Sequence, residues 1–229
     1  MKKLSKKRRK TLLKKVINFM HDKYVIGIDE AGRGCLVGGL WVAAIATKSP
    51  EYLKAIEVND SKKLSKKKRE ELYEAIKDNC LIETIRISVK DIDTKNLNDL
   101  EMDAVIKIIK RFAEKLQIER VNIDALSVNW FKDKYHIFNK VNEEHEDFQA
   151  EVVTKPKADA IFPSVSAASI VAKVLRDKEM EESEVPGSGY PADRVTYGFI
   201  KKYYKENKCF PDCVRQKWKT IKKIKNNGV

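Results

Sequence analysis

The sequence predicts an α/β protein in which a mixed five-stranded sheet is flanked by helices and followed by a helical C-terminal segment. Three observations predict this class. Five short runs have the apolar or alternating character of strands, amphipathic segments lie between them, and only helical patterns follow the last strand-like run. With 229 residues, 42% of them hydrophobic, the chain is long enough for a sizeable core in one large domain or two small ones.

The first part of the chain predicts a hairpin, a capped helix and a third strand. Residues 24–29, "YVIGID", are an apolar run that ends in a glycine-rich turn, and residues 40–47, "LWVAAIAT", supply a second strand of hairpin length. In residues 61–79, Ser65 is a candidate N-cap for an amphipathic helix. Residues 81–89 then alternate in the manner of a strand.

The second part predicts two more strands among helices. Residues 97–116 have helical periodicity, and residues 120–128 and 147–155 are strand-like. A helix is expected over 163–183, with Pro163 in its first turn, where the missing N–H does no harm. The remaining segments are, in order, a loop at 185–193 and helices at 195–207 and 211–224.

The net charge of +13 is unevenly distributed along the chain. Residues 1–23 carry a net charge of +9 and residues 201–229 carry +8, which leaves −4 on the rest. Basic ends on a mildly acidic body favour a polyanionic partner that lysine and arginine side chains hold. Solvated basic tails explain the same charges, so charge alone leaves both readings open.

Composition also bounds the compartment. No apolar run approaches the roughly 20 residues that span a membrane. The start, "MKKLSKKRRK", lacks the apolar core and cleavage pattern of a secretory signal. The four cysteines are scattered and show no convincing zinc spacing. We therefore expect a reduced, cytoplasmic protein without a membrane segment.

Four acids occupy positions where strands end or helices begin: Asp29, Glu30, Asp124 and Asp159. Successive strand residues point to opposite faces, so Asp29 and Glu30 are expected to share a site only if the chain bends there. Gly32 and Gly34 supply such a bend. If the first and fourth strands are parallel neighbours, Asp29 and Asp124 emerge at the same sheet edge. Acids that cap or solvate turns remain the alternative.

Clustered carboxylates raise one another's pKa values unless cations compensate them. Mg²⁺ or Mn²⁺ takes hard oxygen ligands, and two such ions about 4 Å apart would serve phosphodiester hydrolysis. The four acids therefore predict a site for two divalent ions, if they converge.

The wording around these acids resembles a known family. The blocks "GIDEAGRG", "DSKKLSKKKREELYE", "NIDAL", "KADAIFPSVSAASIVAKVLRDKEM" and "GSGYPADRVTYGFIKKYY" resemble the signature blocks of type 2 ribonuclease H, or ribonuclease HII, in the family order. They span roughly residues 24 to 220, and "GSGYP" and "TYGF" look like the archaeal, single-subunit branch. The resemblance implies a ribonuclease H-like catalytic domain at 24–180, a helical substrate-binding extension at 181–229 and a basic extension at 1–23.

The resemblance also implies the activity. Members of the family cut the RNA strand of RNA–DNA hybrids and single ribonucleotides embedded in duplex DNA, leaving 3′-hydroxyl and 5′-phosphate ends. Their four metal-binding carboxylates map to Asp29, Glu30, Asp124 and Asp159. A monomer that acts in ribonucleotide excision and DNA replication is expected.

Further family positions match substrate-binding residues. The Gly-Arg-Gly motif that senses the ribose 2′-hydroxyl maps to Gly32, Arg33 and Gly34, and glycine lets backbone groups approach the sugar closely. The tyrosine that stacks on the next sugar maps to Tyr190. Lys62 and Lys63 precede a predicted helix N-terminus, where phosphate binds well, although solvated surface lysines fit the pattern too.

The chain departs from the family pattern at two places. Cys35 and Gly39 stand where the family usually has proline, which predicts a looser loop. Two rival functions also remain: a resolvase- or transposase-like nuclease of the same fold, and a basic nucleic-acid-binding module without catalysis.

Overall fold

The computed structural model describes residues 23–58, 64–125 and 129–227. The basic extension 1–23 lies outside these residues except for Lys23, as do Lys62 and Lys63. The elements are, in chain order, β1 (Tyr24–Ala31), β2 (Leu40–Thr47), α2 (Pro50–Ala55), α3 (Lys66–Asn79), β3 (Leu81–Ile87), α4 (Val89–Thr94), α5 (Leu97–Ala113), β4 (Ile118–Asp124), α6 (Trp130–Asn142), β5 (Glu151–Lys155), the 3₁₀ turn η1 (Ala158–Ala160), α7 (Pro163–Glu181), α8 (Arg194–Asn207) and α9 (Lys219–Asn227).

The five strands form one mixed sheet in the order β3-β2-β1-β4-β5. The pairs β1–β2 and β2–β3 are antiparallel, whereas β1–β4 and β4–β5 are parallel. This confirms the predicted hairpin, and it meets the condition that the first and fourth strands are parallel neighbours. The C-terminal ends of β1 and β4 therefore lie at the same edge of the sheet.

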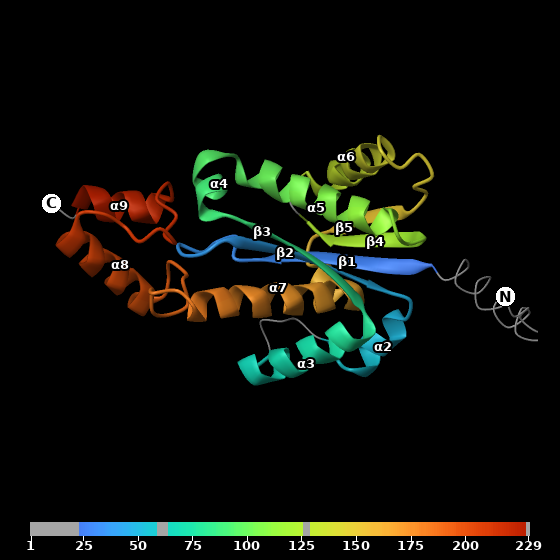
Figure 1. The fold of residues 1–229 in the computed structure, drawn as a ribbon, viewed down its shortest axis with the longest axis horizontal. Helices are drawn as coiled ribbons and strands as arrows, with labels where there is room; N and C mark the ends of the chain where they lie inside the picture. The colour runs from blue at the N-terminus through green and yellow to red at the C-terminus, as the bar shows by residue number, and fades with distance from the viewer. Residues whose placement is uncertain (1–22, 59–63, 126–128, 228–229) are drawn as a thin grey trace, which may run out of the picture.

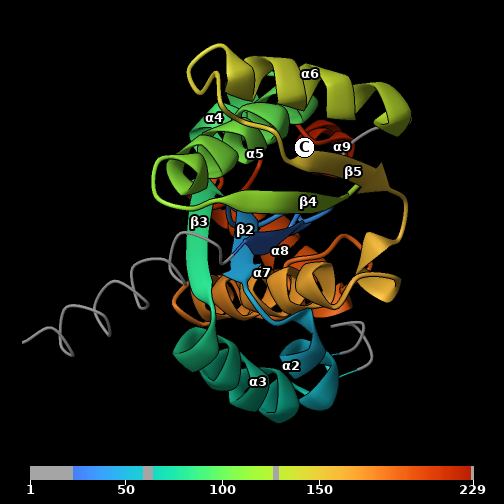
Figure 2. The same cartoon turned by 90° about the vertical axis from the view of Figure 1, so that its right-hand side faces the viewer.

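Helices cover both faces of the sheet (Figures 1 and 2). Helices α5 and α6 lie on one face, over a core that includes Ile26, Ile28 and Ile109. Helix α7 lies on the other face, with α2 and α3 outside it, and buries small residues such as Ala167 and Ala168. Two cores separated by one sheet give the three-layer arrangement that the sequence predicts.

Strand β1 and helix α7 approach each other very closely. A Cβ atom added at Gly27 would lie 2.1 Å from the carbonyl carbon of Ser164. Only glycine fits this contact, because a methyl group there would overlap the helix backbone. The contact fixes the strand that carries Asp29 and Glu30 against the helix that carries Ser169.

Helices α8 and α9 lie together at one end of the molecule and form a third core (Figure 1). That core includes Leu36 and Val37 from the loop between β1 and β2, and Val37 pairs with Val214 in an isolated antiparallel bridge. The C-terminal segment is therefore packed directly on the loop that follows the first two acids. None of the helices in the described ranges combines the length and the apolarity needed to cross a bilayer.

Several element predictions are confirmed and others are wrong. Ser65 caps α3 by accepting from the Lys68 N–H, and Pro163 lies in the first turn of α7. The helix predicted over 211–224 is wrong in its first part, because residues before α9 instead make loop contacts with the β1–β2 connection. Helices α2, α4 and α6 were not predicted, and β5 is shorter than the strand expected at 147–155.

Candidate active site at the end of β1 and β4

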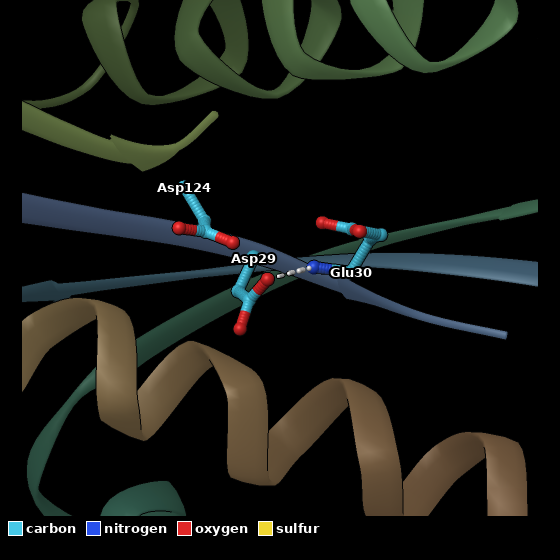
Figure 3. Close-up of side chains that lie close together, drawn as sticks. All are labelled: Asp29, Glu30 and Asp124. Carbon is cyan, nitrogen blue, oxygen red and sulfur yellow. Dashed lines mark hydrogen bonds between the residues drawn. The ribbon is translucent and has the colours of Figure 1, made fainter. Parts of the chain in front are cut away.

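Three of the four predicted carboxylates converge at this sheet edge. Asp29, Glu30 and Asp124 each offer an oxygen, and these three oxygens lie within 4.8 Å of one another. The β1–β4 register ends at the pair Ile28 and Ile123, so Asp124 follows directly alongside Asp29. Figure 3 shows Asp29 directed toward α7, with Glu30 and Asp124 on the other side of β1.

The predicted bend between Asp29 and Glu30 is wrong. Strand β1 continues through both residues to Ala31, and each keeps its antiparallel partner on β2. The two side chains leave opposite faces of the strand, but carboxylates are long enough to meet around the edge of β1 where its pairing with β4 stops. We call the group formed by Asp29, Glu30 and Asp124 the carboxylate corner. The backbone also orients it, because the Glu30 N–H donates to Asp29 Oδ1 at 2.7 Å.

The electrostatics of this corner are unfavourable without a cation. Burial and the adjacent Glu30 carboxylate raise the pKa of Asp29 well above its usual range, and a hydrogen bond with Ser169 opposes this only in part. Burial and the nearby Asp124 raise the pKa of Glu30, against the favourable effect of the Arg33 charge. Two neighbouring acids with raised pKa values bind a proton or a metal ion in preference to remaining free anions.

The donor set fits a divalent metal ion. It consists of carboxylate oxygens alone, which are the hard ligands that Mg²⁺ and Mn²⁺ prefer. Asp29 is 7% exposed, whereas Glu30 and Asp124 are half-buried, so one side of the group is open to water and substrate. Asp124 is oriented by the Ala158 N–H, which donates to its Oδ1 at 2.7 Å.

The fourth predicted acid, Asp159, is not part of the three-carboxylate group. It lies on η1, one residue after the amide that binds Asp124, and it is half-buried. Its backbone carbonyl accepts from the Ser166 hydroxyl, which ties η1 to the first turn of α7. Asp159 therefore follows the residue whose amide holds Asp124, but its carboxylate lies outside the three-carboxylate group.

The Gly-Arg-Gly loop follows β1 immediately. Gly32 has φ of +101°, and a Cβ there would lie 2.9 Å from the Gly39 carbonyl oxygen, so this turn requires glycine. A Cβ at Gly34 would meet nothing within 4 Å, so the space beside this exposed glycine is open. The Arg33 guanidinium forms an ion pair with Glu101 and donates to Asn98, both at the start of α5.

A buried arginine from the C-terminal segment fixes the backbone of the same loop. Arg215 is fully buried and donates to the carbonyl oxygens of Arg33, Gly38 and Gly39 at 3.1, 2.8 and 2.9 Å. Burial lowers the pKa of Arg215 to about 10, which still leaves the guanidinium charged at neutral pH. The central guanidinium carbon of Arg215 lies 5.4 Å from the centre of the Trp218 ring.

Tyr190 lies on the loop between α7 and α8, next to the Gly-Arg-Gly loop. The Leu36 N–H donates to the Gly189 carbonyl at 2.7 Å, which joins the two loops. The guanidinium of Arg176 lies 4.8 Å from the Tyr190 ring centre and also donates to Cys35 Sγ at 3.2 Å. Burial, followed by the Cys35 thiol, raises the pKa of Tyr190 to about 12, so its hydroxyl stays protonated.

The two residues that stand in place of proline have specific partners, and the looser loop stays a prediction. Cys35 is fully buried beneath Tyr190 and Arg176. The Gly39 N–H donates to Glu179 Oε1 at 2.8 Å, a bond that proline lacks the hydrogen to make. A Cβ at Gly39 would also lie 2.6 Å from the Ile87 carbonyl oxygen.

Sequence reasoning missed the residues that hold the loop. Glu101 carried a signal, because it falls on the apolar stripe of α5 one turn before Ala104 and Val105. Arg215 carried none, because it lies in a segment predicted to be a helix and its partners are backbone atoms 176 to 182 residues away.

Comparison with solved structures identifies the fold. The ribonuclease H2 of Pyrococcus horikoshii OT3 is 32% identical, covers 90% of this chain and 98% of its own, and superposes with a TM-score of 0.74. The ribonuclease HII of Archaeoglobus fulgidus, solved in complex with PCNA, is 34% identical over 87% of this chain and 96% of its own, with a TM-score of 0.74. Bst-RNase HIII in complex with Mn²⁺, 19% identical over 90% and 70%, shares the fold with a TM-score of 0.73.

The mixed sheet and the carboxylate corner thus define an enzyme of the ribonuclease H-like class, which depends on divalent metal ions. The sequence model described as ribonuclease HII matches residues 26–221. The ribonuclease HII of Thermococcus sibiricus is 43% identical over 86% of this chain and 89% of its own, and that of Methanocella arvoryzae is 40% identical over the same shares. The chain belongs to the ribonuclease HII family and is an endonuclease for RNA–DNA hybrids.

Proposed function

We propose that this enzyme cuts the RNA strand of RNA–DNA hybrids and also cuts at single ribonucleotides in duplex DNA, leaving 3′-hydroxyl and 5′-phosphate ends. The observation that carries the proposal is the convergence of Asp29, Glu30 and Asp124 directly before the glycine-rich loop at 32–34. A carboxylate corner next to an open backbone brings a cleavage site and a sugar-reading site together.

The carboxylates would hold two ions, Mg²⁺ or Mn²⁺, with Asp159 as the fourth ligand. Asp159 is supported by its position on η1 beside the Ala158 amide that orients Asp124. When bound, the ions supply an activated water and charge stabilisation at the leaving oxygen. The protein contributes the orientation: Ser169 and the Glu30 amide hold Asp29, so the anionic oxygens are preset before the substrate arrives.

The Gly-Arg-Gly loop would read the ribose. Gly34 is exposed and has no atom within 4 Å of its absent Cβ, so a sugar can approach the backbone there. A 2′-hydroxyl both donates and accepts hydrogen bonds, and this is the group that separates RNA from DNA. The Arg33 side chain is 36% exposed and remains within reach of the adjacent phosphate while it is anchored on α5.

Tyr190 would stack on the sugar that follows the ribonucleotide. Its ring is half-buried against Arg176, so one face is supported by the protein and its position is set before the substrate binds. Lys62 and Lys63 would bind phosphate just before α3. We also propose a monomer that works in the reduced cytoplasm during replication and ribonucleotide excision; the described cysteines form no disulfide.

The test is a comparison of three substrates with purified enzyme in Mg²⁺ or Mn²⁺: an RNA–DNA hybrid, a DNA duplex with one ribonucleotide, and plain DNA. Cleavage of the first two, with ends mapped as above, is expected, and plain DNA should stay intact. Asp29→Asn should still bind the duplex but lose turnover. Cutting of plain DNA would indicate a resolvase-like nuclease, and full function of Asp29→Asn would indicate a binding module.

A second arm tests the ribose reader. Arg33→Ala is expected to lose activity on the single embedded ribonucleotide, with Asp99→Asn, an exposed change on the same helix that anchors Arg33, as the matched control. Equal cleavage of that substrate by Arg33→Ala and the control would remove Arg33 from the proposed role.

A further inference from the structure

Glu101 is a fully buried carboxylate on α5, with 0% of its surface exposed. It lies on the stripe that also buries Ala104, Val105 and Ile108, at a position where a helix of this kind normally carries an apolar residue. Burying a carboxylate without a compensating charge costs several kcal/mol. A residue of this type at this position therefore needs a partner.

The partner is Arg33 of the Gly-Arg-Gly loop. Its guanidinium forms an ion pair with Glu101 and donates to the Asn98 side chain, one turn earlier on α5. Among the described residues, neither Glu101 oxygen has a further hydrogen-bond partner. Nothing else in the described structure compensates this buried carboxylate, so the position of the Arg33 guanidinium is set by α5.

The ion pair between Arg33 and Glu101 matters because the carboxylate corner lies close to Arg33 in the chain. Glu30 is three residues earlier, and its carboxylate belongs to the three-oxygen group with Asp29 and Asp124. A guanidinium released from α5 would find carboxylates at the corner, and a bidentate pair there would compete with a metal ion for the same oxygens.

We propose that Glu101 is a positioning residue that holds the Arg33 guanidinium on α5 and thereby keeps it from pairing with Glu30. The carboxylate corner then stays available to divalent ions, and the Gly-Arg-Gly loop keeps one orientation. This inference rests on the proposed metal-dependent function of the corner. In this arrangement Glu30 and Arg33, which are close in sequence, do not pair with each other. Glu30 remains available to bind the ions, and Glu101 neutralises Arg33.

The experiment is a double-mutant cycle read by Mn²⁺ binding to the full-length protein, measured by isothermal titration calorimetry without nucleic acid. Glu101→Gln is expected to weaken Mn²⁺ binding about tenfold. Arg33→Ala alone is expected to bind Mn²⁺ at least as tightly as the unmodified protein. In the Arg33→Ala background, Glu101→Gln should change the affinity by less than about twofold.

Two controls keep the cycle interpretable. Asp99→Asn removes one negative charge from the exposed side of α5, and it should leave Mn²⁺ affinity unchanged, which measures the general effect of charge. Glu101→Asp keeps the charge but shortens the reach to Arg33. It replaces Glu101→Gln in the cycle if circular dichroism shows that Glu101→Gln does not fold.

Equal weakening by Glu101→Gln with and without Arg33 would overturn the proposal, because the effect would then not pass through the guanidinium. Unchanged Mn²⁺ affinity in Glu101→Gln would overturn it as well. Failure of the proposed function is distinguishable, since it would appear in the unmodified protein as absent cleavage of hybrids whatever the cycle shows.

Discussion

Replacing Asp29 by asparagine should make the metal-free protein more stable. Asp29 is 7% exposed and stands beside two other carboxylates, so its charge is costly in the fold. Asparagine has the same shape and keeps an oxygen that can accept from the Glu30 N–H. The substitution therefore removes the repulsion and the desolvation of a charge while it keeps the local hydrogen bond.

The magnitude follows from the burial of a charged group beside two like charges. A buried polar group without full compensation costs about 1–3 kcal/mol, and a charged one costs more. We expect a gain of about 2 kcal/mol at pH 8, which for a chain of this size corresponds to a rise of about 4–8 °C in the unfolding midpoint.

The sign of the pH dependence is fixed by the raised pKa of Asp29. The folded protein binds the Asp29 proton more tightly than the unfolded chain does, so protonation favours the fold. The metal-free wild type should be most stable below the ordinary pKa of 3.8 as far as this group is concerned, and it should lose that contribution as the pH rises through the raised pKa. Asp29→Asn should lack this loss.

The assay is calorimetric unfolding in EDTA between pH 5 and 8, repeated with Mn²⁺. Asp177→Asn is the matched control, because Asp177 is a half-buried acid on the α7 side of the sheet that is paired with Arg69 and Lys173 at 3.1 and 2.5 Å. Although burial opposes it, Lys173 and Arg176 hold the pKa of Asp177 below its usual range, so Asp177→Asn should destabilise the protein. A midpoint for Asp29→Asn equal to or below that of the wild type in EDTA would refute the reasoning.

Three further outcomes test other parts of the structure. Gly27→Ala should cost about 3 kcal/mol or more by chemical denaturation, because the new methyl group would overlap the Ser164 backbone. Gly39→Pro should lower the unfolding midpoint, since it removes the N–H that donates to Glu179; an unchanged midpoint would contradict this. Asp193, whose pKa backbone N–H donors lower to about 2, caps α8, so Asp193→Asn should remove a contribution that is present above pH 3.8 and lost as the pH falls through 2, which urea midpoints across pH 2–5 would detect.

The sheet and the carboxylate corner could be predicted because local signals agree there. Residues 24–29 read as a buried strand that ends in acids, and the parallel pairing with the strand at Asp124 brings those acids to one edge. What the sequence could not show is how Asp29 and Glu30 meet. That geometry depends on where the β1–β4 pairing stops, which is a property of two strands and not of one.

The surroundings of the Gly-Arg-Gly loop could not be predicted for a similar reason. In the sequence, Arg215 is one of many basic residues in a segment predicted to be a helix. In the structure, the bridge between Val37 and Val214 and the hydrogen bonds from Arg215 to three loop carbonyls hold this segment in place. Tertiary contacts override helical propensity there. The sequence shows that Glu101 is an acid at an apolar position of the helix, but it does not show that Arg33 is its partner.

The buried arginine of the C-terminal segment has a consequence for engineering. Because Arg215 grips the carbonyls of Arg33, Gly38 and Gly39, residues 181–229 cannot be exchanged as an independent module. A chimera that carries the C-terminal segment of a relative would hold the Gly-Arg-Gly loop through different contacts. If this loop reads the ribose as proposed, substrate preference should change with the segment, although none of the proposed metal-binding carboxylates lies in it.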